Sequence, residues 1–112
     1  MTAPKISQVD PQQAGTLLDE GALLVDVRED DEWLAGHAAG AMHVPLAQVG
    51  SVELPQEGTV LVVCRSGGRS SKAVTALTAA GVQAVNVDGG MTAWAAAGLP
   101  MVSGIGEDPQ VI

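Results

Sequence analysis

The sequence predicts one α/β domain in which helices cover both faces of a mainly parallel sheet. The chain has 112 residues, the size of one ordinary domain, and 46% of them are hydrophobic, enough to form a core. Strand-like apolar runs alternate with segments of helical periodicity, the order typical of β-α-β units. Trp33 and Trp94 are the only aromatic residues, so Val, Leu, Ala and Met must fill the interior. Such aliphatic runs fit strands that are buried on both faces.

The first half of the chain begins with a helix. Asp10 can cap it, Pro11 occupies its first turn, and Gln13 can reach back in a capping box. Gly21 is a natural end for this helix. After it we expect a buried strand at 23–27, a short acidic helix at 29–35 and a short strand at 41–44.

The second half repeats the alternation. Residues 46–58 fit either a short helix or a loop. Residues 59–63 form the strongest strand because they are rich in β-branched residues. A helix at 70–80, a strand at 84–87 and a last helix at 91–97 follow.

The chain divides into a domain and a tail. Residues 1–101 carry all of the periodic pattern. Residues 102–112 have no clear period and contain glycines and a proline. We expect them to be loosely ordered or draped over the surface.

Charge and composition exclude several function classes. The net charge of −8 argues against binding nucleic acid or an anionic membrane. The single cysteine excludes an internal disulfide, and His37 and His43 are few for a metal centre. Residues 1–10 do not resemble a secretory signal, and no apolar run reaches the roughly 18 residues of a membrane span. We therefore expect a cytoplasmic protein.

The loop after the strongest strand is the candidate site, because ligands of parallel sheets bind beyond the carboxyl ends of strands. It contains Cys64, Arg65, Ser66, Gly67, Gly68, Arg69 and Ser70. The glycines allow the backbone to curl and turn several N–H groups inward, and the following helix adds its amino-terminal N–H groups. These donors would lower the pKa of a thiol, and the arginines would bind an oxyanion. The pattern indicates a nucleophile in an anion-binding loop.

This segment has other possible interpretations. A lone cysteine at the end of an apolar strand is often a buried small hydrophobe. Glycines, arginines and serines directly after Cys64 favour the nucleophile instead. The segment from Gly67 to Lys72 does not match the spacing of a Walker phosphate loop, and no dinucleotide fingerprint is present.

This loop resembles the active-site loop of the rhodanese-family sulfurtransferases. Two further stretches resemble the signatures of that family, and together the likeness covers roughly residues 5–101. The first comprises Asp26, Val27, Arg28, Glu29, Glu32, Trp33, Gly36, His37, Gly40, Ala41 and Pro45. The second comprises Asp88, Gly89, Gly90, Trp94, Gly98 and Pro100.

The resemblance implies a three-layer domain with about five strands and a two-step sulfur transfer through Cys64, without a metal or an organic cofactor. A donor such as thiosulfate, mercaptopyruvate or a persulfide would give its outer sulfur to Cys64. Cyanide, a thiol or a protein would then accept that sulfur. The backbone N–H groups of residues 65–70 would hold the transferred sulfur, and Arg69, with Arg65, would orient the donor's anionic part.

The family resemblance leaves alternatives. Related phosphatases and arsenate reductases have five residues between their cysteine and arginine, whereas four separate Cys64 from Arg69. This tighter loop favours a sulfur atom over a phosphoryl group. A persulfide relay subunit and a non-catalytic binding module with the same fold are the other candidates.

Residues outside the loop have expected supporting roles. An acid at the position of Asp26 pairs, in the resembling family, with the arginine that follows the cysteine, here Arg65; a local cap or turn contact is the alternative. Arg28 is a candidate for donor binding, although an ion pair with Glu29 or Glu32 is the expected role. We further expect His37 to hydrogen-bond to backbone, and both tryptophans to anchor the core.

Overall fold

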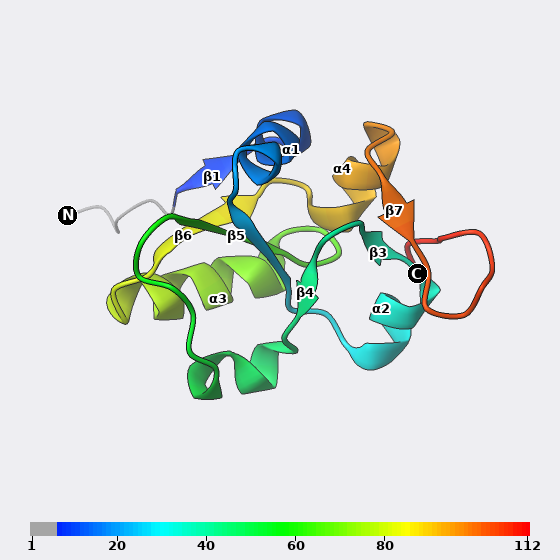
Figure 1. The fold of residues 1–112 in the computed structure, drawn as a ribbon. Coiled ribbons are helices and arrows are strands. Elements are labelled where there is room, and N and C mark those ends of the chain that lie inside the picture. Colours follow the sequence, from blue (N-terminus) through cyan, green and yellow to red (C-terminus); the bar gives the residue numbers. More distant parts are fainter. Residues whose placement is uncertain (1–6) are drawn as a thin grey trace.

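Five parallel strands form the central sheet of this protein. The computed structural model describes residues 7–112, so the first six positions of the expected 1–101 domain, and of the 1–10 segment, lie outside the described residues. The strand order is β1-β6-β5-β2-β4, and each neighbouring pair is parallel (Figure 1). The strands are β1 (Gln8–Val9), β2 (Leu23–Asp26), β4 (Met42–His43), β5 (Thr59–Val63) and β6 (Gln83–Val87). The predicted α/β class with a five-stranded, mainly parallel sheet is confirmed.

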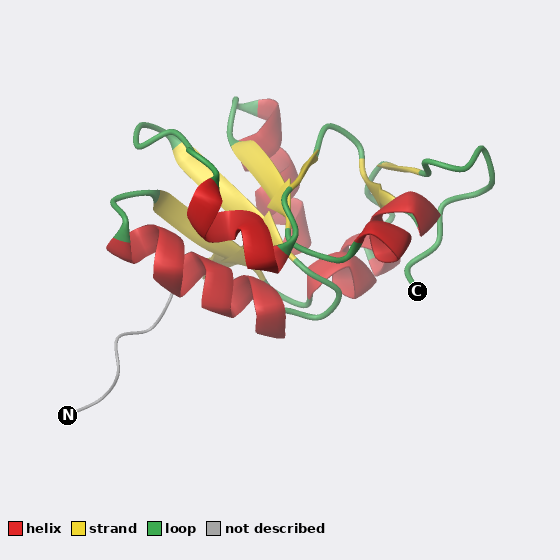
Figure 2. Ribbon diagram, turned by 90° about the horizontal axis from the view of Figure 1, so that it is seen from below, coloured by secondary structure: helices red, strands yellow, loops and turns green. Residues whose placement is uncertain are grey.

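Helices cover both faces of the sheet, as Figure 2 shows. On one face lie α3 (Gly68–Ala79) and the 3₁₀-helix η1 (Leu46–Ser51). On the other face lie α1 (Pro11–Asp19) and α4 (Gly90–Ala96). Because side chains alternate along a strand, β5 supplies both cores: Val60 and Val62 pack toward α3, and Leu61 and Val63 pack toward α1 and α4. Burial on both faces explains the continuous apolar runs.

Helix α1 begins where its sequence predicts. The Asp10 carboxylate accepts a hydrogen bond from the Gln13 backbone at 2.8 Å, and the Gln13 side chain accepts one from the Asp10 backbone at 3.0 Å. Pro11 occupies the first turn. The predicted capping box is therefore present.

The two tryptophans have different surroundings. Trp94 is buried in the core below α1, and its indole N–H donates to the Pro100 carbonyl at 3.1 Å. Trp33 is only partly buried and stacks on the rings of His37 and His43. The expectation that Trp33 anchors the core is wrong, because its helix, α2 (Asp30–Ala35), lies beside the sheet and not over it (Figure 1).

The chain after residue 101 lies against α2 and a small second sheet. In that sheet β3 (His37–Ala38) pairs antiparallel with β7 (Met101–Val102). The backbone N–H of Gly104 donates to the Leu34 carbonyl, and that of Gln110 donates to the Ala35 carbonyl, both at 2.9 Å. These contacts lay residues 103–112 along the surface (Figure 1).

Several short elements were not predicted. Strands β1, β3 and β7 have two residues each, too few to show a period of two. The ambiguous segment 46–58 starts with the 3₁₀-helix η1. Within residues 7–112, every helix is too short or too polar to cross a membrane.

Substituting Gly36 tests the contact between the tail and α2. A Cβ at Gly36 would lie 2.5 Å from the carbonyl oxygen and 2.6 Å from the nitrogen of Gln110. We expect Gly36→Ala to displace residues 103–112, so that limited proteolysis in this segment becomes several-fold faster. Gly50→Ala is the matched control, because a Cβ there meets no atom within 4 Å. Equal cleavage rates in both variants would contradict the described tail contact.

Candidate active site

The candidate site lies at the carboxyl end of β5, where Cys64 leaves the sheet and the chain turns into α3. Backbone N–H groups of helix α4 donate hydrogen bonds to this turn. The backbone N–H of Met91 donates to the Cys64 carbonyl at 2.8 Å, and that of Thr92 donates to the Arg65 carbonyl at 3.0 Å. A Cβ at Gly90 would lie 2.6 Å from the Arg65 carbonyl oxygen, so only glycine permits this close approach.

The loop curls around the Cys64 sulfur. Gly67 adopts a left-handed backbone with φ of 116°, which favours glycine, and its N–H donates to Cys64 Sγ at 3.0 Å. Helix α3 begins at the next residue. From its first turn the Ser70 hydroxyl lies 3.2 Å from Sγ. The predicted anion-binding loop therefore has its donors directed at the sulfur.

Two opposing effects act on the Cys64 thiol. Burial raises its pKa, because a thiolate loses solvation away from water. Hydrogen bonds from the Ser70 hydroxyl and from the backbone N–H groups of Ser70, Gly67 and Ser66 lower it. The hydrogen bonds prevail, and the pKa of Cys64 lies below its ordinary value. The site therefore favours the nucleophilic thiolate.

The structure combines features of both interpretations of Cys64. The residue is 1% exposed and belongs to the core cluster on the α3 face, as a buried hydrophobe would. Its sulfur nevertheless faces the donors of its own loop. A purely structural cysteine has no need of such donors, so the geometry supports the nucleophile.

The two loop arginines have different partners. Arg69 forms a bidentate ion pair with Glu32 of α2, with N–O distances of 2.6 and 2.9 Å. This contact is the main reason that the pKa of Glu32 falls to about 2. Arg65 is exposed, and its Nε donates to the Ile112 carbonyl at 3.1 Å. Both cations thus border the loop, and Arg69 is held in place.

The expected pairing of Asp26 with Arg65 is wrong. Asp26 instead binds Arg28, whose backbone N–H, Nε and Nη2 all donate to its carboxylate at 2.8–3.1 Å. Arg28 Nη2 also donates to the Gly36 carbonyl. Both side chains are fully buried, so the nearest guanidinium neutralises the carboxylate, while Arg65 stays at the surface. The local turn contact was the correct alternative.

The expected ion pair of Arg28 with Glu29 or Glu32 is likewise wrong. Burial of Arg28 makes it a scaffold residue that fixes the chain after β2. The expectation for His37 is confirmed: its Nδ1 lies 2.7 Å from the Trp33 carbonyl.

Asn86 is the buried polar residue that the sequence interpretation missed. It is 2% exposed on β6, and its Oδ1 accepts from the Ser70 hydroxyl at 2.6 Å. The available signal was an amide side chain within an otherwise apolar strand.

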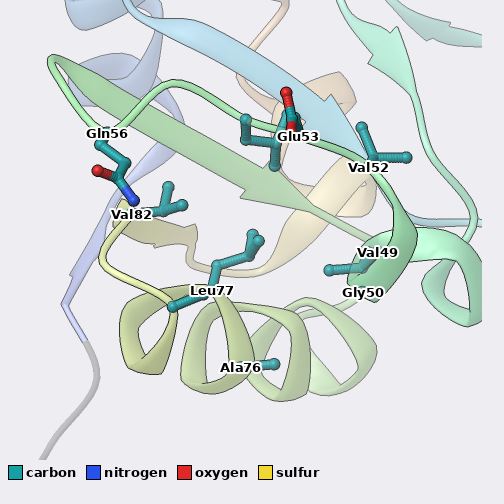
Figure 3. A pocket seen from close by; sticks show the side chains of 10 residues that line it. Val49, Gly50, Val52, Glu53, Gln56, Ala76, Leu77 and Val82 are labelled. Atoms are coloured by element: carbon teal, nitrogen blue, oxygen red, sulfur yellow. The ribbon is translucent and has the colours of Figure 1, made fainter.

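A separate cavity of about 420 Å³ lies between the chain preceding β5 and the carboxyl-terminal half of α3 (Figure 3). Val49, Val52, Leu77 and Val82 line it, together with the polar residues Glu53 and Gln56. It is at the opposite end of α3 from Cys64. Within residues 7–112, no three His, Cys, Asp or Glu side chains gather closely enough to hold a metal ion.

The site that this fold presents is a buried cysteine whose sulfur faces the hydrogen-bond donors of its own loop. The model of the rhodanese-like domain matches residues 10–97. This chain therefore belongs to the rhodanese-like domain family.

Relatives and solved structures agree with this assignment. Thiosulfate sulfurtransferase 18 of Arabidopsis thaliana is 41% identical over 110 residues, covering 82% of this chain and 80% of that protein. The crystal structure of a rhodanese-related protein from Thermoplasma volcanium superposes with a TM-score of 0.80 at 26% identity, covering 86% of this chain and 97% of that one.

Some relatives are longer. An uncharacterized protein of Synechocystis is 40% identical over 103 residues, covering 89% of this chain. The match spans only 54% of that protein, about half of its length.

Removing one partner of the buried ion pair should destabilise the fold. Asp26→Asn leaves the Arg28 charge buried without a counter-charge, so we expect the free energy of unfolding to fall by about 3–5 kcal/mol. Asp19→Asn, at an exposed carboxylate, should change it by less than about 0.5 kcal/mol. Urea unfolding followed by circular dichroism measures both. Equal stability of the two variants would contradict the buried pairing.

The lowered pKa of Cys64 predicts its reactivity. The rate of alkylation by iodoacetamide should rise with pH through a midpoint below the value of about 8.5 for a free cysteine. The matched control is the same chain in denaturant, where its only thiol should regain the ordinary midpoint. A folded-state midpoint equal to or above the unfolded one would show that burial outweighs the loop's donors.

Proposed function

We propose that this protein is a sulfurtransferase that carries a sulfane sulfur as a persulfide on Cys64. The observation that carries the proposal is the placement of the Cys64 sulfur among the donors of its own loop. The names of its relatives support sulfur transfer, and thiosulfate is the donor that several of those names state.

The first step is attack of the Cys64 thiolate on the outer sulfur of thiosulfate. A bond forms between the two sulfurs, and the sulfur–sulfur bond of thiosulfate breaks. Sulfite leaves with the electron pair of that bond. The step needs no proton transfer, because the nucleophile is already ionised.

The second step returns the enzyme to its first state. A nucleophilic acceptor, such as cyanide, attacks the outer sulfur of the persulfide. The bond between the two sulfurs breaks, thiocyanate leaves, and Cys64 recovers its thiolate. A thiol or a protein acceptor would follow the same course. Because Cys64 is the only cysteine, the acceptor must come from outside the chain.

The loop's groups have distinct roles in this scheme. The N–H groups of Ser66, Gly67 and Ser70 stabilise the negative sulfur, as an oxyanion hole stabilises oxygen. Arg69, fixed by Glu32, and the exposed Arg65 provide positive charge for the donor's sulfonate.

Intact mass spectrometry tests the proposal. After incubation with thiosulfate the protein should gain the mass of one sulfur atom, and an added thiol or cyanide should remove it. Cys64→Ser should gain no sulfur and show no thiosulfate:cyanide activity, because a serine hydroxyl is not ionised at neutral pH. Circular dichroism of the variant checks that it is folded. Sulfur uptake by Cys64→Ser, or none by the unchanged protein, would overturn the proposal.

A further inference from the structure

Asn86 is a buried carboxamide on the apolar α3-facing side of the sheet. It is 2% exposed, and Ala84, two residues earlier on the same face of β6, packs in the core cluster beneath α3. A buried polar side chain at such a position must be hydrogen-bonded, and its partners indicate what it does. The shortest of its contacts joins it to Ser70, which in turn contacts the Cys64 sulfur.

The Ser70 hydroxyl has three acceptors within reach and only one hydrogen to donate. Asn86 Oδ1 lies at 2.6 Å, whereas Cys64 Sγ and the Gly67 carbonyl oxygen both lie at 3.2 Å. While the sulfur is a neutral thiol, the hydroxyl gives its hydrogen to the nearer oxygen of Asn86. The sulfur then has no hydrogen from Ser70, which suits a neutral thiol that can itself donate to Ser70 Oγ.

The Asn86 carboxamide can also donate a hydrogen bond to Ser70 instead of accepting one. A half-turn of its end brings Nδ2 toward Ser70, where it donates to Oγ and leaves the hydroxyl hydrogen free for the sulfur. The other end of the amide has loose contacts at 3.4 Å with Gln8 Oε1 and Ser71 Oγ. Gln8 is exposed and its own amide can turn, so the reversal leaves no buried group without a partner.

We propose that Asn86 is a positioning residue for the transfer reaction, whose reversible carboxamide lets the Ser70 hydroxyl donate to the Cys64 sulfur whenever that sulfur is charged. This inference rests on the proposed role of Cys64 as the nucleophile. Asn86 acts only through Ser70. A chain of two hydrogen bonds directed at one charge is stronger than the isolated bond, because each polarises the other.

Asn86 is neutral, and the charged groups near Cys64 lie on other elements. They are Arg65 of the loop, Arg69 of α3 and, through Arg69, Glu32 of α2 and Glu29, which caps the amino end of α2. Strand β6 and helix α4 carry no charged side chain. Neutral substitutions at position 86 therefore leave the charges around the sulfur unchanged.

The test is the pH midpoint of Cys64 alkylation in a double-mutant cycle. Asn86→Leu should raise the midpoint by about 0.5 to 1 pH unit, because the hydrogen bond lost in the thiolate state supports a charge and is stronger than the neutral one lost in the thiol state. In a Ser70→Ala background the same substitution should have no effect. The matched control is Gln83→Ala, at an exposed position of the same strand, which should leave the midpoint unchanged.

Two results would overturn the inference: an unshifted or lowered midpoint in Asn86→Leu, or an equal shift with and without the Ser70 hydroxyl. If Asn86→Leu does not fold, Asn86→Asp replaces it. An ionised carboxylate only accepts, so the midpoint should rise more with Ser70 present than in Ser70→Ala; equal rises would overturn the inference. Alkylation does not require sulfur transfer. The proposed function could therefore fail in the mass measurement while the coupling between Asn86 and Ser70 persists. Conversely, the coupling could be absent while the mass measurement still shows sulfur uptake.

Discussion

The hydrogen bonds that the 64–70 loop makes to a buried sulfur are the interaction on which the site depends. Burial alone would keep Cys64 protonated and inert, because an ionised sulfur away from water is costly. The Gly67 N–H at 3.0 Å and the Ser70 hydroxyl at 3.2 Å offset that cost. The same burial, at 1% exposure, limits the access of oxidants to the thiol. Protection and ionisation are therefore compatible only while these donors remain directed at the sulfur.

The surrounding elements serve this arrangement in separate ways. Helix α4 donates backbone hydrogen bonds to the carbonyl groups of Cys64 and Arg65. Glu32 of α2 holds Arg69 beside the loop, and the pair of Asp26 with Arg28 fixes the chain that leads from β2 into α2. Each contact joins a segment near the carboxyl edge of the sheet to a neighbour. Parallel strands bring these segments together although they lie far apart in the sequence.

Much of this could be predicted from the sequence, because its signals are local. The capping box at Asp10, the β-branched run of β5 and the glycines after Cys64 each determine their own surroundings. Pairings between distant residues were less accessible. Arg28 and Arg65 were both possible partners of Asp26. Only the structure shows that Arg28 forms the ion pair while Arg65 remains exposed. Asn86 was missed because an amide within a strand has no periodicity, and Trp33 was misplaced because its short helix lies beside the sheet.

Helix α4 has one more consequence for the loop that it supports. Its backbone N–H groups donate to the carbonyls of Cys64 and Arg65 at 2.8 and 3.0 Å. Because Gly90 has no Cβ, the two segments pack so closely that no side chain fits between them. The orientations of these peptide groups are thus set before any ligand arrives. A cradle of fixed dipoles does not need to rearrange when negative charge moves from one sulfur to the next. We therefore expect the backbone of the empty and the loaded protein to be nearly superimposable, with the adjustment confined to hydroxyl and amide hydrogens.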